Sequence, residues 1–316
     1  MPLLVGALVT TPPPPPAPPR PPVVRPTPIN PGEYVPTFID PDGVEWAMNP
    51  PGQEFFTLNA VTGYGITPVE LITRPDPRGG VVVAGVRDLP RTLVWPVRIR
   101  DRTHLGFLAR WRAIGDALAK TKRKGPGLFR LTRPDGSARE VLCHYQGGME
   151  GEPGGGWLDD TPELSLLVPD GHWRAPEPIK IPWSSGDVDD YFAPYPMISS
   201  GDVLGDAVTV TNPGQVEAWP TWRLEGPATQ LVATNNTRGQ AFTIAHDLGP
   251  GEYLDITTRP GRVTDQDGEP VMGALVRPGS VLWRLDPGAN DLDFAVTGGG
   301  PATRLTLSFY PRWETA

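Results

Sequence analysis

Hydrophobic and polar residues alternate in many short runs along this chain, and the pattern predicts a protein built mainly from β-strands. The clearest run is RTLVWPVRIR, residues 91–100. Neighbouring side chains of a strand point to opposite faces, so one face of this run is apolar and half-buried. The apolar face carries Leu93, Trp95, Val97 and Ile99. The outward face carries Thr92, Val94, Pro96, Arg98 and Arg100.

Pro96 restricts where this strand can lie in a sheet. Proline has no backbone N–H to donate to a ladder of hydrogen bonds, and it is therefore confined to edge strands and bulges. We expect residues 91–100 to form an edge strand or to contain a bulge.

Further β-rich runs fill the rest of the first half. A hairpin is expected at residues 127–145, where Pro134-Asp135-Gly136 supplies the turn. The other runs lie at residues 38–46, 54–60, 69–74, 81–87 and 162–168.

One segment, from Thr103 to Lys120, follows a helical period instead. Its apolar residues fall within one sector of a helix, which predicts an amphipathic helix packed on a sheet. Thr103 is expected to be the N-cap, and the sequence KTKRKGPG after the last turn favours a helix end there. The apolar face carries Phe107, Leu108, Trp111, Ile114 and Leu118.

From residue 201 onward the pattern contains strands only, separated by turn signals every eight to fifteen residues. That rhythm is typical of a β-sandwich. The expected strands lie at residues 207–212, 219–226, 229–234, 240–246, 252–258, 280–285, 291–297 and 302–310.

The chain therefore divides into four parts. A proline-rich arm over residues 1–36 precedes an α+β domain over residues 37–175, a split barrel or sandwich with one helix. An irregular, proline-rich linker over residues 176–200 leads to the β-sandwich of residues 201–316. The arm has eleven prolines between residues 12 and 28, so we expect an extended polyproline conformation, either as a tail without a partner or as a strap on a neighbouring subunit.

Composition narrows the functional classes. The 316 residues include 42 prolines and 37 glycines, which suits short strands and many turns. The formal charge of −8 argues against nucleic acid as the main ligand. A single cysteine, Cys143, excludes internal disulfides and is typical of folding in a reducing cytoplasm. The apolar start has no cation before it and is short, so we expect neither an export signal nor a membrane span.

No catalytic motif is present. The nucleophile elbow, the zinc-protease helix and the phosphate-binding loop are all absent, and Gly63-Tyr64-Gly65 is interpreted as a turn. The four histidines, His104, His144, His172 and His246, have no partner nearby in the sequence. We expect no enzyme activity, no cofactor and no metal.

The acidic segment TDQDGEP raises the question of a calcium site. A loop counted from Asp265 places Pro270 where glycine is needed and Val276 where glutamate is needed. The segment around Asp187, Asp189 and Asp190 fails in the same way. Gly268 after Asp267 instead favours a tight hairpin with solvated carboxylates.

Tryptophans in the expected sandwich leave one binding function open. Trp222 and Trp283 share strand parity with leucines and are expected in the core, where aromatic residues at strand spacing usually lie. Trp219 and Trp313 are the candidates for stacking on a host cell-wall glycan.

Several sequence blocks resemble the distal tail proteins of long-tailed, non-contractile bacteriophages, in the version common among phages of actinobacteria. In the first half they are DPDGVEW, VTGYGITPVE, LVWPVRIR, GLFRLTRPDGSAREVLCHYQGGMEG and PELSLLVPDGHWRAP. In the second half they are VTNPGQVEAWPTWRLEGP, GEYLDITTRPGRVTDQDGEPV and GSVLWRLDPGANDLDFAV. The resemblance covers residues 37–316 and leaves out the proline arm.

The resemblance implies a belt domain that closes a ring of six copies and a galectin-like sandwich outside the ring. Such a ring joins the tail tube to the tip, lets DNA pass, and has no catalytic residues. The implied partners are further copies of the chain, the tail tube protein, the tail-tip hub or tail-associated protein and the tape measure protein. Receptor-binding proteins and host glycans are further possible partners. The implied location is the tip of the virion tail, assembled in the bacterial host cytoplasm.

A ring subunit must present two unlike surfaces, and an edge strand offers one of them. The strand with Thr92, Val94, Pro96, Arg98 and Arg100 is therefore the candidate ring interface. A carbohydrate-binding adsorption module is the alternative function. A cell-wall hydrolase is the weakest candidate, because no acid, base and nucleophile set is evident.

Overall fold

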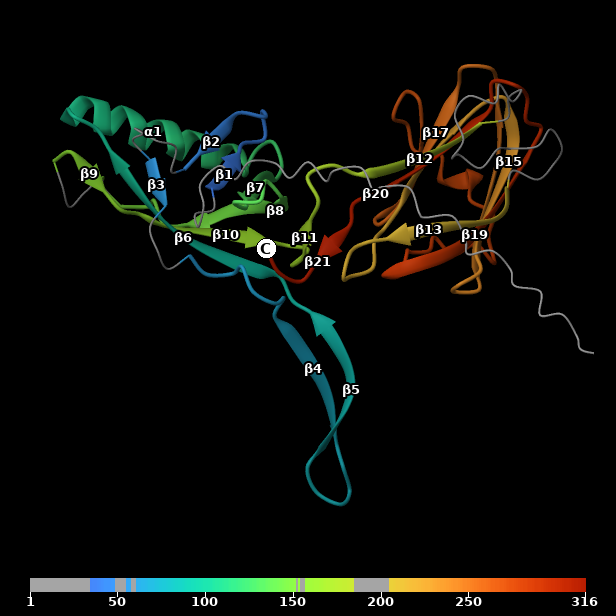
Figure 1. Cartoon of the computed structure of the whole chain (residues 1–316), viewed down its shortest axis with the longest axis horizontal. Coiled ribbons are helices and arrows are strands. Elements are labelled where there is room, and N and C mark those ends of the chain that lie inside the picture. Colours follow the sequence, from blue (N-terminus) through green and yellow to red (C-terminus); the bar gives the residue numbers. More distant parts are fainter. Residues whose placement is uncertain (1–34, 49–54, 58–60, 152, 154–156, 185–204) are drawn as a thin grey trace, which may run out of the picture.

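Two β-rich units lie side by side, and a long two-stranded ribbon projects from the first of them (Figure 1). The computed structural model describes residues 35–48, 55–57, 61–151, 153, 157–184 and 205–316. Residues 1–34 of the proline arm and the Asp187 to Asp190 segment lie outside the described residues, whereas Val35 and Pro36, assigned to the arm from the sequence, belong to the first strand.

The first unit is built on one antiparallel sheet with the strand order β2-β1-β7-β8-β10-β6-β3. β9 pairs with β6, and β11 pairs with β8. Its strands are β1 (Val35–Ile39), β2 (Glu45–Ala47), β3 (Phe55–Thr57), β6 (Arg91–Arg100), β7 (Gly127–Thr132), β8 (Ala138–Gly147), β9 (Asp159–Asp160), β10 (Glu163–Val168) and β11 (Trp173–Arg174).

A single α-helix is present among the described residues, α1 (His104–Lys120), and it covers one face of this sheet (Figure 1). Thr103 is its N-cap, as predicted, and the Thr103 hydroxyl accepts a hydrogen bond from the Gly106 N–H at 3.1 Å. Phe107, Ile114 and Leu118 of the predicted apolar face are buried. Leu108 and Trp111 are partly buried against the same core. The amphipathic pattern therefore predicted both the helix and the side that it buries.

An ion pair fastens the last turn of α1 to the loop after β1. The Lys120 ammonium lies 2.5 Å from the Asp40 carboxylate, which also accepts hydrogen bonds from the N–H groups of Asp42 and Val44. Burial raises the pKa of the Asp40 carboxyl, but these hydrogen bonds outweigh burial and leave its pKa below the ordinary value. The pair therefore persists until the medium is strongly acidic.

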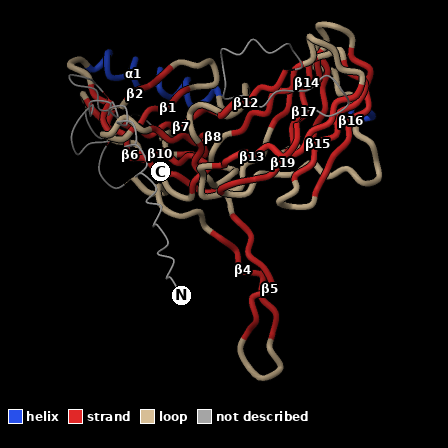
Figure 2. Tube along the Cα trace, turned by 45° about the vertical axis from the view of Figure 1, so that its right-hand side comes forward, coloured by secondary structure: helices blue, strands red, loops and turns tan. Residues whose placement is uncertain are grey.

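The ribbon consists of β4 (Val69–Pro75) and β5 (Val81–Asp88), which pair only with each other among the described strands. Every residue of both strands is exposed except Gly85, which is half-buried. Figure 2 shows the ribbon extending well away from both units. The runs at 69–74 and 81–87 therefore form strands as expected, but not strands of a core sheet.

The second unit is a β-sandwich, as predicted. One sheet has the order β12-β20-β14-β17-β18, and the other has the order β13-β19-β15-β16. The strands are β12 (Ile179–Ser184), β13 (Gly205–Asn212), β14 (Thr221–Glu225), β15 (Ala228–Asn235), β16 (Gln240–Leu248), β17 (Tyr253–Thr258), β18 (Gly261–Asp265), β19 (Gly288–Thr297) and β20 (Arg304–Phe309). A 3₁₀ turn, η1 (Met272–Ala274), lies beside β18.

Aromatic side chains fill the space between these two sheets. Trp222 is fully buried, and its ring contacts four others at centroid distances of 5.1–6.4 Å. Trp283 is also buried, and its indole N–H donates to the Ala233 carbonyl at 3.0 Å. Both tryptophans predicted for the core are therefore there. The four rings around Trp222 belong to Trp183, Phe242, Trp283 and Phe294.

Three expectations about the elements are wrong. Residues 280–285 were expected to be a strand, but they run without a ladder and make one isolated bridge, between Leu285 and Ala218. The expected linker of residues 176–200 contains β12, which pairs with β20 inside the sandwich. The last residues leave the sandwich, because β21 (Arg312–Trp313) pairs with β11 of the first unit.

Residues 91–100, predicted to form an edge strand or to contain a bulge, do not form an edge strand. β10 pairs with residues 91–96 of β6 and β9 with residues 99–100 on one side. On the other side, β3 pairs with residues 97–99, and Thr62 forms a bridge with Val94. The alternation itself is confirmed, because Leu93, Trp95, Val97 and Ile99 are all fully buried. Among the described residues on this side, β3 pairs with residues 97–99 and Thr62 with Val94, and neither contact involves Pro96.

Cys143 lies fully buried in the first core, and burial raises the pKa of its thiol to about 12. The thiolate that reacts with disulfide reagents is therefore scarce at pH 8. We expect the native protein to give almost no reaction with an aromatic disulfide reagent at pH 8, and one equivalent of thiol to appear on unfolding in guanidinium. Complete labelling of the native protein within minutes would contradict this placement of Cys143.

Candidate interdomain junction and interaction surfaces

The two units meet where the end of the chain returns to the first unit. β21 adds Arg312 and Trp313 to β11, opposite Arg174 and Trp173. The Ala316 N–H then donates to the Tyr64 carbonyl at 3.0 Å, and Ala316 is buried in the first core. The first unit is therefore completed by residues that follow the sandwich in the sequence.

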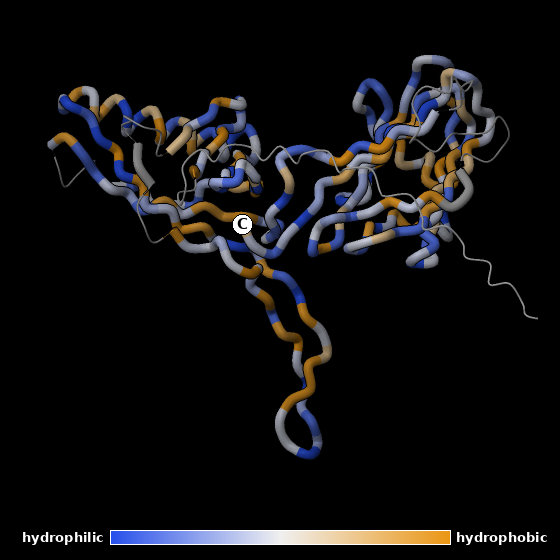
Figure 3. The backbone as a smooth tube through the Cα atoms, viewed as in Figure 1, coloured by the Kyte–Doolittle hydropathy of each residue, from blue (hydrophilic) through white to orange (hydrophobic). Residues whose placement is uncertain are grey.

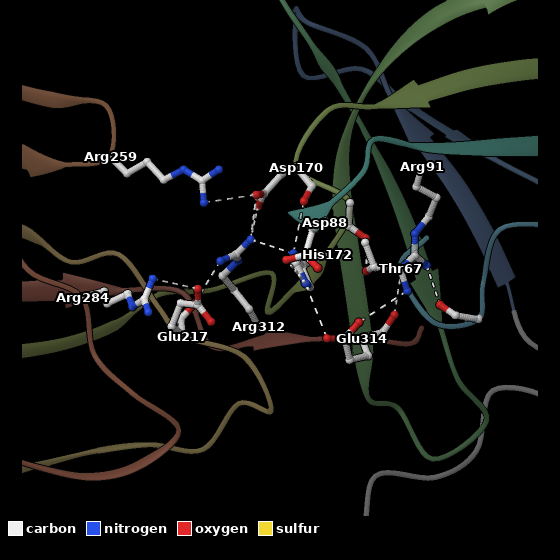
Figure 4. A network of polar contacts seen from close by, with 12 residues as sticks. Thr67, Asp88, Arg91, Asp170, His172, Glu217, Arg259, Arg284, Arg312 and Glu314 are labelled. Atoms are coloured by element: carbon white, nitrogen blue, oxygen red, sulfur yellow. Dashed lines mark hydrogen bonds and ion pairs between the residues drawn. The ribbon is translucent and has the colours of Figure 1, made fainter. Parts of the chain in front are cut away.

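Arg312 connects the two units by charge and by hydrogen bonds (Figure 4). Its guanidinium donates to both carboxylate oxygens of Asp170 in the first unit, at 2.6 and 2.7 Å. A second nitrogen donates to the Glu217 carbonyl of the sandwich at 2.9 Å. Arg312 is only 6% exposed, whereas the Asp170 side chain is 46% exposed, so this charge-assisted contact is buried on the arginine side only.

Arg91 occupies the opposite side of the same junction (Figure 4). Its guanidinium donates to the carbonyls of Gly63, Gly65 and Glu314 and to the Thr67 hydroxyl, at 2.7–2.9 Å. Burial lowers the pKa of Arg91, and the Glu314 carboxylate partly opposes that effect. One side chain therefore ties together the turn before β4, the start of β6 and the end of the chain.

The turn that Arg91 binds requires glycine. Gly63 has φ = +94°, and a Cβ on it would lie 2.7 Å from the Thr92 carbonyl oxygen. Gly63-Tyr64-Gly65 is thus the turn predicted from the sequence, and its carbonyls face a guanidinium rather than a nucleotide.

His172 lies between the two arginines and the base of the ribbon. Its Nδ1 is 3.1 Å from the Asp170 carbonyl oxygen and 3.0 Å from a guanidinium nitrogen of Arg312. Its Nε2 is 3.6 Å from the Glu314 carboxylate and 3.7 Å from the carboxylate of Asp88, the last residue of β5. The junction therefore fixes the ribbon base relative to both units, which is a positioning role.

The sequence pattern did not predict that these junction residues lie close together. A usable signal existed for Arg91, which shares strand parity with Leu93 and Trp95 and must therefore point inward. No such signal marked Asp170, His172 or Arg312, because the contacts of Arg312 with Asp170 and His172 span 142 and 140 residues of the sequence.

The two candidate glycan-binding tryptophans have different surroundings. Trp219 is half-buried, and the guanidinium groups of Arg259 and Arg284 lie 5.4 and 5.8 Å from its ring centroid. Trp313 packs on the first core, with the guanidinium of Arg139 at 4.4 Å. A hollow of about 270 Å³ in the sandwich is lined by Glu225, Gly226, Gly251, Tyr253, Ala302 and Arg304, and by neither tryptophan. Glycan contact through these two side chains stays a prediction.

The role of residues 92–100 as a ring interface also stays a prediction, but contact through added strand pairing no longer applies. Because β6 is paired on both sides, a second copy cannot add a strand along it. The outward side chains of Thr92 and Arg100 are exposed, and those of Val94, Pro96 and Arg98 are half-buried. Any contact with a neighbour would therefore be made by side chains.

The acidic segment forms a hairpin tip. The Asp265 carboxylate accepts hydrogen bonds from the N–H groups of Asp267 and Glu269, at 3.0 and 2.9 Å. Gly268 has φ = +80°, as the expected tight turn requires. In the part of the chain that the structure describes, no three His, Cys, Asp or Glu side chains are grouped so that they could hold a metal ion.

Comparison with known proteins finds a family model that matches part of the second unit. Residues 213–313 match the family model of the siphovirus-type tail component, C-terminal domain. No curated protein matches the chain.

Among the described residues, no helix is long and apolar enough to cross a membrane.

Solved structures share the fold of both units. The crystal structure of the Dit protein of phage SPP1 aligns with a TM-score of 0.60 and 16% identity, over 89% of this chain and 99% of that chain. A chain of the phage P2 baseplate in its activated conformation with Ca aligns with a TM-score of 0.52 and 8% identity, over 87% of this chain and 98% of that chain. A chain of the same baseplate with Sr aligns with a TM-score of 0.54 and 10% identity, over 88% of this chain and 98% of that chain. At these identities the likeness concerns the fold, which is Dit-like: mainly β, with one helix and several antiparallel sheets.

Proposed function

We propose that this protein is a structural, non-enzymatic component of the tail tip of a siphovirus, a Dit-type subunit of the baseplate hub. One observation carries the proposal: the C-terminal unit matches a siphovirus tail-component family, and the whole two-unit fold extends over nearly the full length of the SPP1 Dit protein. That protein is described as a hub of the adsorption apparatus in phages that infect Gram-positive bacteria.

The finer proposal is a ring of six copies that joins the distal end of the tail tube to the tip and lets DNA pass. Its partners are the tail tube protein, the tape measure protein and the tail-associated hub protein, and its host phage is of the actinobacteriophage type. These details rest on the sequence resemblance. A repeating contact of the required kind needs two unlike surfaces on each subunit.

Size-exclusion chromatography with light scattering tests the ring. We expect a mass of about six times 34.2 kDa for the purified chain. A single copy at high concentration would contradict the ring and would favour a monomeric glycan-binding module. Antibody labelling of purified tails tests the location separately, and signal anywhere other than the tail tip would contradict the tail-tip assignment.

A further inference from the structure

The β4–β5 ribbon has one apolar face and one mixed face. Residues paired across an antiparallel ladder share a face, and the faces alternate along each strand. Thr73, Pro75 and Asp88 therefore share one face with five apolar residues, which are Val69, Leu71, Val81, Val83 and Val86. We call these five residues the ribbon face. Figure 3 shows the hydrophobic residues that run along the ribbon.

The opposite face has a different character. Glu70 and Arg87 are paired across the two strands, and their side chains form an ion pair at 2.9 Å. Ile72, Arg74 and Val82 follow on the same face, and the Ile72 side chain lies near Gly85. The opposite face therefore mixes charged and apolar side chains, whereas five of the eight residues on the first face are apolar residues of the ribbon face.

The ribbon face is large and uncovered within this chain. Its five side chains are 46–64% exposed. Together they present on the order of 500 Å² of apolar surface, near the upper end of what a monomeric protein exposes. That area is more than half of the roughly 800 Å² that one partner contributes to a standard interface. A two-stranded ribbon without such cover is only marginally stable in water.

A second exposed apolar surface lies at the far end of the first unit, where α1 begins beside β9 (Figure 1). Leu105 is 78% exposed, Trp157 is 74% exposed and Leu158 is 41% exposed. The His104 ring stacks on the Trp157 indole at a centroid distance of 4.0 Å, and its Nδ1 is 2.8 Å from the Trp157 carbonyl oxygen. These contacts hold the indole in place. We call the four residues the Trp157 patch.

The charges beside the Trp157 patch are arranged in pairs. Arg98 pairs with Asp159, and Arg110 lies 2.6 Å from Asp101. On the ribbon, the Glu70 and Arg87 charges are paired as well. Both surfaces thus have an apolar centre beside ion-paired charges, and the exposed Arg100 and Arg102 also lie near the Trp157 patch in the sequence. An apolar centre with a polar rim is typical of a surface that contacts another protein.

We infer that the ribbon face of one copy packs on the Trp157 patch of the next copy of this chain. The two surfaces are comparable in size and unlike in shape, and they lie at separate places on the first unit. That is the arrangement of a heterologous contact, which each copy makes twice in a closed ring, once with its ribbon and once with its patch. The inference rests on the proposed function, and it names the residues through which neighbouring subunits meet.

Two neighbouring ribbon residues provide a matched pair of variants. Leu71 is 54% exposed on the ribbon face, and Ile72 is 51% exposed on the opposite face. We expect Leu71→Asp to weaken association by at least about 30-fold, as expected for a buried interface anchor, and to give a monomer in light scattering. Ile72→Asp should leave the wild-type mass unchanged. Circular dichroism and the thermal midpoint of each variant, measured in dilute solution, report whether it is folded.

Mixing two variants tests whether the contact is heterologous. Leu71→Asp retains an intact patch, and Leu105→Asp retains an intact ribbon. Each variant alone should be a monomer, whereas an equal mixture should form pairs with the mass of two copies and nothing larger. In such a pair, the ribbon of the Leu105→Asp chain lies on the patch of the Leu71→Asp chain.

The outcomes separate this inference from the proposed ring. A wild-type chain that is monomeric at high concentration contradicts the ring itself, and the inference fails with it. A wild-type ring that persists in Leu71→Asp or Leu105→Asp overturns the inference and leaves the ring standing. Equal loss of assembly in Ile72→Asp, or a mixture that stays monomeric, would also overturn the contact described here.

Discussion

Replacing Arg91 with methionine is expected to lower the free energy of unfolding by about 3–5 kcal/mol, because it leaves one buried and three partly buried acceptors without this donor. The guanidinium is 2% exposed and serves three carbonyls and one hydroxyl. Methionine fills much of the same volume but donates no hydrogen bond. Denaturation in urea, followed by tryptophan fluorescence, measures the change.

Arg100→Met is the matched control for this substitution. Arg100 ends the same strand with its side chain exposed, and the same replacement there should change stability by no more than about 0.5 kcal/mol. Equal effects of the two substitutions would show that the Arg91 contacts contribute little to the junction.

Replacing Trp222 with alanine is expected to destabilise the sandwich by about 3–5 kcal/mol, because the indole leaves a cavity that the surrounding rings cannot close. Trp222 is fully buried between the two sheets, in contact with the four aromatic side chains named above. Chemical denaturation measures the decrease in the free energy of unfolding directly. A loss below about 1 kcal/mol would mean that the two sheets collapse onto the vacated space.

Trp157→Ala supplies the comparison for the Trp222 substitution. It removes an indole that is 74% exposed, so its folding stability in dilute solution should change by only about 0.5 kcal/mol. Dilution matters because assembly adds apparent stability by mass action. The two substitutions thus compare a tryptophan that stabilises the fold, Trp222, with a tryptophan that we assign to contact between copies, Trp157.

The junction explains how one chain can carry a ribbon in a defined direction. Asp88 ends the ribbon and Arg91 begins β6, so only two residues separate the exposed hairpin from a buried guanidinium. Arg312 and Glu314 reach the same place from the end of the sandwich. A ribbon held at its base by both units keeps its direction, which a repeating contact requires.

Local pattern was sufficient for most elements. The period of two in residues 91–100 and the period of 3.6 in residues 104–120 each depend only on neighbouring residues, so the sequence alone identified the buried faces of β6 and α1. The N-cap at Thr103 and the hairpin glycine at Gly268 follow from backbone preferences that are equally local. The sandwich was predicted from the spacing of its strands, although residues 280–285 pack in the core without a ladder.

By itself, then, the sequence determined the helix, most of the strands and the apolar side of each, because these depend on side-chain spacing over a few residues. Only the tertiary structure decided what each apolar side meets. It placed β6 inside a sheet, returned Arg312–Trp313 to the first unit and left the ribbon face uncovered. VELITR and VVVAGVR alternate like the core strands, and whether such a face is covered depends on segments distant in the chain or on another copy.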